Sequence, residues 1–155
     1  ELLIDLGFIM RGEIIWQKSK GANANFAWGS WLSASNPVIR DIHEYCLVFS
    51  KDTFKKPSKG ESSLEKEEFM ESTLSVWNIN AARAKKIGHP APFPVDLPYK
   101  FINLYTYKND LVLDPFIGSG TTAIAAKKLN RNYVGYEIEK EYIKVANNRI
   151  ENEVN

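Results

Sequence analysis

The clearest pattern of apolar and polar residues lies in the last third of the chain. A short apolar run, Leu111–Leu113, predicts a central parallel strand, and helical spacing over 119–129 predicts the helix that follows it. A strand over 132–137 and a helix over 139–151 complete a βαβα unit with a right-handed crossover. The residues expected to face inward from the two helices are Ile124, Ala125, Leu129, Tyr142, Ile143, Ala146 and Ile150.

Three further elements are predicted upstream of this unit. Glu13–Lys18 and Tyr45–Phe49 are short runs rich in β-branched and aromatic residues, which are typical of strands, and the second run suits a strand buried on both faces. A helix is expected to begin at Asp96, which can cap it, with Pro98 in its first turn. The side chains expected on one face of that helix are Leu97, Phe101, Leu104 and Tyr105.

The connecting segments have a different composition. Residues 20–37 are rich in Gly, Asn and Ser and predict a long loop, whereas 51–70 are Lys-rich and then Glu-rich and predict a mobile surface insertion. Three prolines stiffen 88–94 into an extended segment. At the start, 2–6 have helical spacing without a capping residue or an initiator Met, so we expect a fragment entered within a helix.

Composition narrows the class of protein. The chain has 155 residues, 44% hydrophobic and 25% charged, which suits one globular domain. A net charge of +1 argues against a protein that binds nucleic acid by bulk charge alone, but it permits a local basic face. The single cysteine, Cys46, excludes an intrachain disulfide and a cysteine metal cluster, and it favours a reducing, cytoplasmic setting. No apolar run approaches the roughly 18 residues that suggest a membrane span.

The candidate chemistry lies in the turn after the strand at Leu111–Leu113. Within Asp114–Thr122, Gly118 and Gly120 allow positive φ and close approach of the backbone to a ligand. The residues Ser119, Thr121 and Thr122 add hydroxyls and amides at a helix N-terminus. Glu137 follows Gly118 by 19 residues, at the end of the next strand, where a carboxylate can accept hydrogen bonds from ribose. The pattern therefore predicts a nucleoside-binding βαβ unit.

The nature of the nucleoside follows from what accompanies this turn. Neither a P-loop nor a full GxGxxG fingerprint is present in the sequence. A carboxylate at Asp114 would repel a pyrophosphate, whereas it suits the ammonium and sulfonium groups of S-adenosylmethionine. The alternative is that the glycines form a plain turn and that Asp114 only caps the helix.

The same residues resemble the cofactor-binding end of a family of DNA amino-methyltransferases. This family methylates adenine N6 or cytosine N4, and the resemblance is to its circularly permuted members. The resembling segments are Gly12–Lys18, His43–Lys51, Gly88–Pro94, Asp114–Thr122, Arg131–Glu137 and the run from Tyr142 to Ile150. The resemblance implies an α/β, Rossmann-like, S-adenosylmethionine-dependent methyltransferase fold.

The resemblance also implies three functional parts and one absence. Residues 1–51 would hold later strands of the sheet with an active-site loop, 52–88 a surface insertion or target-recognition region, and 89–155 the cofactor-binding βαβα unit. The family's catalytic Pro-Pro-aromatic motif lies in its N-terminal part, and this sequence contains no Pro-Pro pair. The fold is therefore expected to be partial, without the N-terminal strands and the catalytic motif, and the catalytic residues are unknown.

Residue roles follow from the resemblance. Asp114 and the turn would hold the methionine end of the cofactor and Glu137 its ribose. The full set of expected cofactor contacts is His89, Phe93, Asp114, Phe116, Gly118, Ser119, Gly120, Thr121, Thr122 and Glu137. Alternatives stay open, namely a turn histidine at His89 and ordinary core positions for Phe93 and Phe116. The expected DNA contacts are Lys18, Trp28, Arg40, Arg83, Lys85 and Lys86, with packing of Trp28 on the sheet as its alternative.

The implied reaction is methyl transfer from S-adenosylmethionine to an exocyclic amino group of a flipped base in double-stranded DNA. The resemblance of His89–Pro94 to the cytosine-N4 branch of the family favours cytosine N4, and adenine N6 is the alternative. An inactive cofactor-binding fragment and an enzyme acting on RNA or protein are further alternatives. Cys46, interpreted as a core thiol, argues against cytosine C5 methylation. A cognate restriction endonuclease is a second implied partner, and no metal is expected.

Overall fold

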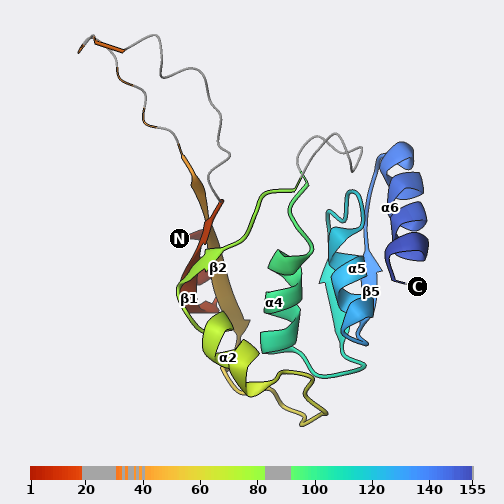
Figure 1. Cartoon of the computed structure of the whole chain (residues 1–155). Helices are drawn as coiled ribbons and strands as arrows, with labels where there is room; N and C mark the ends of the chain where they lie inside the picture. Colours follow the sequence, from red (N-terminus) through yellow and green to blue (C-terminus); the bar gives the residue numbers. More distant parts are fainter. Residues whose placement is uncertain are drawn as a thin grey trace. The chain divides into compact units, whose positions relative to one another are not determined.

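The chain divides into two units in this computed structural model, which describes residues 1–18, 31–32, 34, 37, 39, 41–82 and 92–154. The first unit comprises Glu1–Phe54 and Leu74–Ala81, and the second comprises Lys55–Thr73 and Ala82–Asn155 (Figure 1). The chain length predicts one domain, whereas the structure contains two compact units. The boundaries of these units differ from those of the three functional parts predicted from the resemblance, and the three parts stay a prediction.

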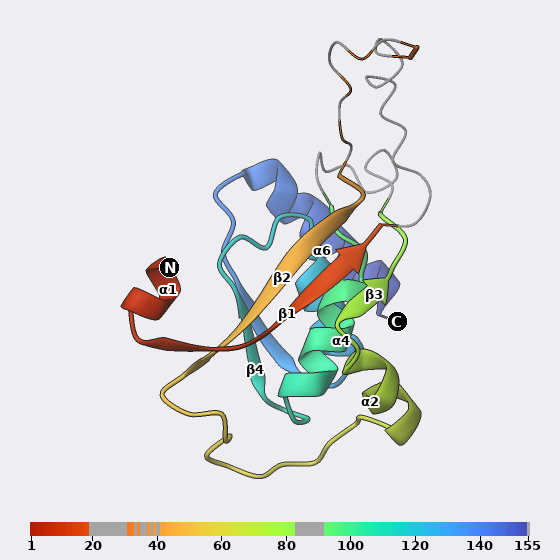
Figure 2. The same ribbon diagram turned by 90° about the vertical axis from the view of Figure 1, so that its left-hand side faces the viewer.

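The first unit is built on a three-stranded sheet. A short helix, α1 (Leu2–Asp5), precedes β1 (Phe8–Gln17), which lies between β2 (His43–Lys51) and β3 (Val76–Asn78) (Figure 2). β1 pairs antiparallel with β2, with an irregularity between Met10 and Gly12, and parallel with β3. Strand β1 is thus longer than the predicted 13–18 and occupies the centre of its sheet.

The core of this unit forms where β1 meets β3. Ile14 and Trp16 of β1 are buried, as are Trp77 and Ile79 in and after β3. The indole Nε1 of Trp16 donates to the Ile79 carbonyl oxygen at 2.8 Å, which satisfies a buried donor and fixes the ring.

Strand β2 differs from its prediction. Tyr45 is 61% exposed and Leu47 is 52% exposed, so β2 is not buried on both faces. Within the described residues β2 pairs with β1 alone and is an edge strand. An antiparallel edge strand is commonly solvated on one face, and this explains why a continuous apolar run is a poor guide here.

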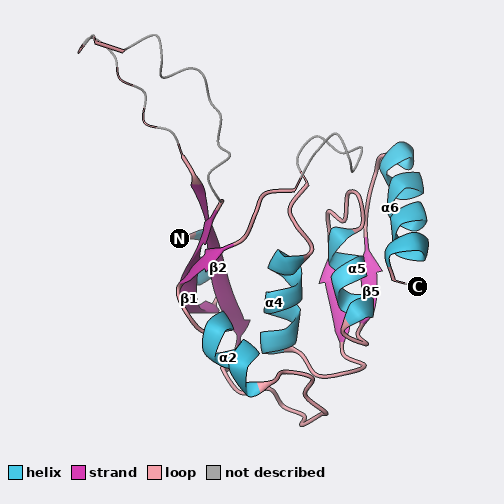
Figure 3. Cartoon of the chain, in the orientation of Figure 1, coloured by secondary structure: helices cyan, strands magenta, loops and turns pink. Residues whose placement is uncertain are grey.

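The second unit contains the predicted βαβα arrangement, which is confirmed. Strand β4 (Leu111–Asp114) is followed by helix α5 (Thr121–Lys128), strand β5 (Asn132–Gly135) and helix α6 (Lys140–Glu153), as Figure 3 shows. The two strands pair in parallel, from Leu111 opposite Asn132 to Asp114 opposite Gly135. Their carboxyl ends therefore lie at one edge of the pair, where a ligand site is expected.

Three helices cover one face of this strand pair. Ile102, Ala125, Ala126 and Leu129 form one buried cluster, against which Val112 of β4 and Tyr133 of β5 pack. A second cluster joins Ala123, Ile124, Ala146 and Ile150. The inward positions predicted for Ile124, Ala125, Leu129, Ala146 and Ile150 are confirmed, whereas Ile143 is 39% exposed.

The other face of the strand pair is apolar and exposed. Leu111 and Leu113 are about 60% exposed (63% and 60%), and Val134 and Tyr136 are 38% and 63% exposed. In the part of the chain that the structure describes, β4 pairs only with β5. The prediction that Leu111–Leu113 forms a central strand is therefore wrong for this structure.

Helix α4 (Asp96–Tyr105) begins where predicted but presents a different face. Its N-cap residue is Val95, so Asp96 lies inside the first turn and does not cap the helix. The buried residues are Leu97, Pro98, Ile102 and Asn103, whereas Tyr105 is 41% exposed. Asn103 is buried because it bonds to Ser63 and Glu68 of the 55–73 segment, a contact that periodicity does not reveal.

The segment predicted as a mobile insertion carries structure of its own. Helix α2 (Lys66–Ser72) begins with a capping box in which Glu65 and Glu68 satisfy each other's backbone amides. Ion pairs join Lys56 to Asp110 and Glu61 to Lys108. The buried guanidinium of Arg131 donates to Ser63 Oγ at 2.7 Å. These contacts attach 55–73 to the end of the unit opposite the carboxyl ends of β4 and β5.

Candidate functional site

The glycine-rich turn connects β4 to α5 at the carboxyl end of the strand pair. Gly118 and Gly120 have φ of +50° and +81°, in the left-handed region that strains residues with a Cβ. The Tyr136 amide donates to the Asp114 carbonyl oxygen at 3.0 Å, and the Ile117 amide donates to the Tyr136 carbonyl oxygen at 2.9 Å. The ladder between the strands thus continues into the turn and anchors its first half.

Asp114 holds the turn through both carboxylate oxygens. Its Oδ2 accepts a hydrogen bond from Thr122 Oγ1 at 2.6 Å, and its Oδ1 accepts one from the Phe116 amide at 3.0 Å. Neither bond goes to a backbone amide of α5, whose N-cap residue is Gly120, so the alternative that Asp114 only caps the helix is wrong. Each carboxylate oxygen has a second lone pair, so these bonds leave acceptor sites for a ligand.

Glu137 lies beside the turn from the end of β5. Its Oε2 accepts from the Gly118 amide at 3.0 Å, and its Oε1 accepts from the amides of Ile138 and Glu139 at 2.8 and 2.9 Å. Asp114 thus bonds to Phe116 and Thr122, near the two ends of the glycine-rich turn, and Glu137 bonds to Gly118 between them. Glu137 therefore lies close to the turn, and its contact with ribose stays a prediction.

Two predicted site hydroxyls are directed elsewhere. Ser119 and Thr121 are 4% and 3% exposed, and their hydroxyl oxygens accept hydrogen bonds from Arg149 at 3.0 and 3.1 Å. The side chains of Ser119 and Thr121 therefore do not lie free at the helix N-terminus. The third predicted hydroxyl, that of Thr122, donates to Asp114. Arg149 lies within the resembling run from Tyr142 to Ile150, but sequence reasoning gave it no role at the site. Its signal is a cation beside the apolar positions Ala146 and Ile150.

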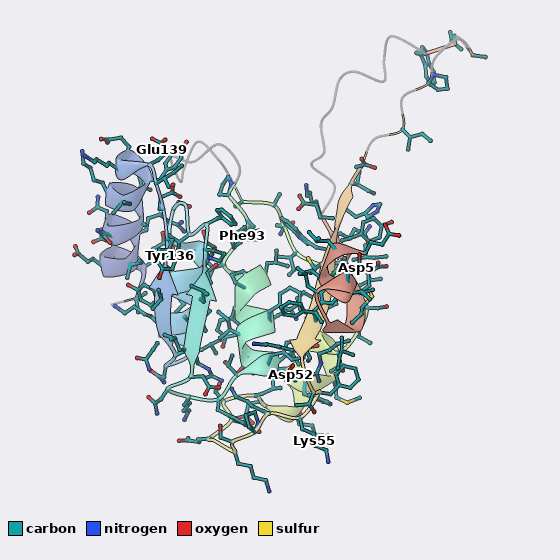
Figure 4. All side chains as sticks on the ribbon, turned by 180° about the vertical axis from the view of Figure 1, so that it is seen from behind. Asp5, Asp52, Lys55, Phe93, Tyr136 and Glu139 are labelled. Carbon is teal, nitrogen blue, oxygen red and sulfur yellow. The ribbon has the colours of Figure 1, made fainter. Side chains whose placement is uncertain are left out.

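The apolar side chains expected around the site differ in exposure. Phe116 is 87% exposed, so its alternative as a core residue is wrong, whereas Phe93 is half-buried. Phe93, Tyr136 and Glu139 lie toward the same end of the second unit (Figure 4). Ile138, next to Glu137, is 92% exposed, and sequence reasoning also missed this apolar group. Exposed apolar side chains beside polar groups are typical of ligand sites.

Most expected DNA contacts lie outside the described residues, and Lys18 is the exception. Lys18 forms an ion pair with Glu44 and lies 5.3 Å from the ring centroid of Trp16. The positions outside the described residues are Trp28, Arg40, Arg83, Lys85 and Lys86, together with His89 of the cofactor set.

Cys46 is a half-buried thiol in β2. Desolvation raises its pKa, and the neighbouring charge of Glu44 raises the pKa further. A nucleophilic cysteine needs a lowered pKa, so this environment suits a structural thiol.

No helix of the described residues is long and apolar enough to cross a membrane. Those residues also contain no group of three or more His, Cys, Asp or Glu arranged to hold a metal ion.

Comparison with known proteins places the chain in a family. The family model N6_N4_Mtase, described as DNA methylase, matches residues 2–148. The type II methyltransferase M.MthZI of Methanothermobacter thermautotrophicus is 31% identical over 163 residues, which cover 97% of this chain and 46% of the relative. M.BglII of Bacillus subtilis is 34% identical, with 91% of this chain and 42% of the relative covered. The chain thus spans less than half the length of these relatives.

Solved structures agree with this placement. TTHA0409 of Thermus thermophilus, complexed with S-adenosyl-L-methionine, superimposes with a TM-score of 0.77 at 30% identity, over 97% of this chain and 56% of that one. The cytosine-N4-specific PvuII DNA methyltransferase has a TM-score of 0.71 at 22% identity and supports the fold alone. These likenesses confirm the Rossmann-like methyltransferase fold. On the match over residues 2–148, the chain belongs to the N6_N4_Mtase family of DNA methylases.

Proposed function

We propose that this chain is the cofactor-binding part of a site-specific DNA methyltransferase that transfers a methyl group from S-adenosylmethionine to an exocyclic amino group. The observation that carries the proposal is the pair of carboxylates, Asp114 and Glu137, that contact one glycine-rich turn at the carboxyl end of β4 and β5. Family membership and the length of the match support the same assignment.

The donor set of this turn fits S-adenosylmethionine. The cofactor has a positively charged sulfonium, an ammonium group and a ribose diol. The negative charge of Asp114 attracts the first two groups, and Glu137 accepts hydrogen bonds from the diol. Gly118 and Gly120 supply the left-handed backbone that the turn requires, and at Gly120 the missing side chain leaves room for Ala146 of α6. A pyrophosphate cofactor would instead be repelled by Asp114 beside the turn.

The neighbouring side chains complete the proposed site. The exposed ring of Phe116 is assigned as its floor, with Phe93 and His89 as its cover. The cofactor supplies a methyl group on a charged sulfur, which an amine can attack directly. This chain's part is to fix that sulfur in place and to limit its access to water. No cysteine nucleophile is needed, in agreement with the raised pKa of Cys46.

The proposal extends to the target base, the recognition region and the DNA contacts. Cytosine N4 is favoured over adenine N6 by the sequence of 89–94. The region 52–88 is assigned to target recognition and 1–51 to the remaining sheet with its active-site loop. Double-stranded DNA is the proposed substrate, and a cognate restriction endonuclease is the proposed companion enzyme. Lys18 is expected to be a weak phosphate contact, since its ion pair with Glu44 offsets its charge.

A second candidate function is an inactive cofactor-binding fragment. The absence of a Pro-Pro pair from the sequence favours it, because the family's tetrapeptide would position the target amine. The two candidates share the cofactor site and differ in catalysis. The chain alone is expected to bind S-adenosylmethionine and to transfer no methyl group to DNA.

Two measurements test the proposal. Incubation of this chain with radiolabelled S-adenosylmethionine and plasmid DNA is expected to leave the DNA unlabelled, and labelled DNA would refute the catalytic assignment. The complete gene product that contains this chain is then expected to methylate the plasmid. Mass analysis of the released nucleosides distinguishes N4-methylcytosine from N6-methyladenine. Unmodified DNA would favour the inactive fragment.

A further inference from the structure

Arg149 of α6 contacts the glycine-rich turn directly. Its Nη1 donates to the Ser119 carbonyl oxygen at 2.8 Å, to Ser119 Oγ at 3.0 Å and to Thr121 Oγ1 at 3.1 Å. A single nitrogen thus joins acceptors on both sides of Gly120. The Arg149 side chain is only 12% exposed, so water competes weakly for these charge-assisted bonds.

Glu153 fixes the orientation of this guanidinium. Arg149 Nε donates to Glu153 Oε1 at 2.8 Å, and Nη2 donates to Glu153 Oε2 at 3.4 Å. Glu153 lies one helical turn after Arg149 and offsets its charge. The planar fork of arginine therefore has one edge on the carboxylate and the other on the turn, an arrangement that lysine cannot reproduce.

Helix α6 also contacts the turn at a second point. A Cβ built on Gly120 would lie 3.1 Å from both Cα and Cβ of Ala146. Ala146 and Arg149 are three residues apart and so lie on the same side of α6. On the β5 side, Glu137 accepts from the Gly118 amide. The turn is thus held between β5 and α6, although its two left-handed glycines are intrinsically the most mobile type of residue.

We propose that Arg149 is a positioning residue for the cofactor: it holds the buried turn at 118–121 in place, and thereby places the groups around it, Asp114, Phe116 and Glu137, for contact with S-adenosylmethionine. The inference rests on the proposed function of this turn. Removal of the guanidinium leaves a carbonyl and two buried hydroxyls without their donor. The turn then samples conformations in which Asp114 and Glu137, which bond to it, are misplaced.

The test measures the affinity of the full chain for S-adenosylmethionine by calorimetry, in conditions where urea denaturation shows each variant to be fully folded. Arg149→Met is expected to weaken binding about tenfold or more, because the variant loses the charge-assisted hydrogen bonds to the turn. Arg149→Lys is expected to bind more tightly than Arg149→Met but more weakly than the unaltered chain. It replaces Arg149→Met in the test if that variant does not fold. Thr121→Val removes one acceptor and should give a smaller loss. Lys144→Met removes an exposed cation from the same helix and should leave affinity unchanged.

The outcomes separate this inference from the proposed function. If the unaltered chain binds and folded Arg149→Met and Arg149→Lys bind equally well, the positioning role is wrong while the proposed function stands. If the unaltered chain does not bind S-adenosylmethionine, both are overturned. Hydrogen exchange gives an independent readout. Relative to the unaltered chain, Arg149→Lys should accelerate exchange of the amides of 118–121 more than exchange of the amides of β4. Equal acceleration throughout the unit would indicate a merely structural residue.

Discussion

The Glu137 carboxylate accepts a hydrogen bond from the backbone amide of Gly118 at 3.0 Å, across a sequence separation of 19 residues. The bond joins the end of β5 to the turn after β4 and therefore places an acidic group at the mouth of that turn. The other oxygen, Oε1, accepts from the amides of Ile138 and Glu139, which fix the carboxylate beside the turn. The distance along the chain that suggests a ribose contact is thus matched by contact in space.

Replacement of this carboxylate should affect ligand binding more than folding. Glu137→Gln keeps one accepting oxygen, but it loses the negative charge that strengthens hydrogen bonds from ribose, and its NH2 group replaces the acceptor of either Gly118 or Ile138 and Glu139. We expect S-adenosylmethionine to bind roughly tenfold more weakly, measured by calorimetry. Glu139→Gln, at a neighbouring side chain that makes no capping bond, is the control and should bind normally. Equal losses in the two variants would show that general charge, not this contact, matters.

Gly120 is expected to tolerate no side chain. Its φ of +81° is strained for alanine, and the new Cβ would lie 3.1 Å from Ala146. Gly120→Ala should lower the free energy of unfolding by about 1–3 kcal/mol in urea titrations. Gly12→Ala is the matched control, because a Cβ placed on Gly12 would meet no atom within 4 Å and its φ is not positive. A loss no larger than that of the control would contradict the geometry of the turn.

Acid sensitivity is expected from Asp110, at the other end of β4. Partial desolvation raises its pKa, but hydrogen bonds from Lys56 and the Tyr107 amide, with the charges of Lys56 and Arg131, outweigh this effect and lower the pKa below its ordinary value. A carboxyl with a lowered folded-state pKa stabilises the protein above its unfolded pKa of about 3.9, and this contribution is lost as pH falls through the folded-state value.

The corresponding variant tests that sign. Asp110→Asn should be less stable than the unaltered chain near pH 7, and the difference should shrink as pH falls below about 4. Unfolding free energies at a series of pH values give the comparison. Glu141→Gln removes one half of an exposed ion pair with Lys144 and should change little at any pH. A difference that grows on acidification would show that the assigned direction is wrong.

The thiol of Cys46 should react slowly. Its raised pKa, from desolvation and then from Glu44, leaves less thiolate at neutral pH than a free cysteine has. Alkylation by iodoacetamide followed across pH should therefore show a midpoint above that of N-acetylcysteine. Glu44→Gln should move the midpoint down by a small amount. Rapid alkylation at pH 7 would instead identify a reactive thiol.

Local patterns predicted the parts of the fold that depend on neighbours in sequence. The strand and helix around Gly118 and Gly120 were predictable because turn residues and the inward positions Ile124 and Ala125 follow one another directly. Helix α2 was missed although Glu65 and Glu68 form a capping-box spacing, because the surrounding charge run suggested a solvated surface. That error was one of interpretation, since the signal is present in the sequence.

Other features depend on partners distant in sequence. The exposure of Tyr45 and Leu113 depends on which strands lie beside β2 and β4, and an apolar run does not specify this. The burial of Asn103 requires Ser63 and Glu68. Arg149 shows the same limit within the candidate site, because its acceptors at Ser119 and Thr121 lie 30 and 28 residues away.

The most direct test of the account is calorimetric titration of S-adenosylmethionine into the unaltered chain, Asp114→Ala and Asp110→Asn. The two carboxylates flank β4 at its opposite ends, so the second variant controls for loss of charge near the same strand. The account predicts binding by the unaltered chain and by Asp110→Asn, and no measurable binding by folded Asp114→Ala. Equal affinity in Asp114→Ala, or no binding by any of the three, would contradict it.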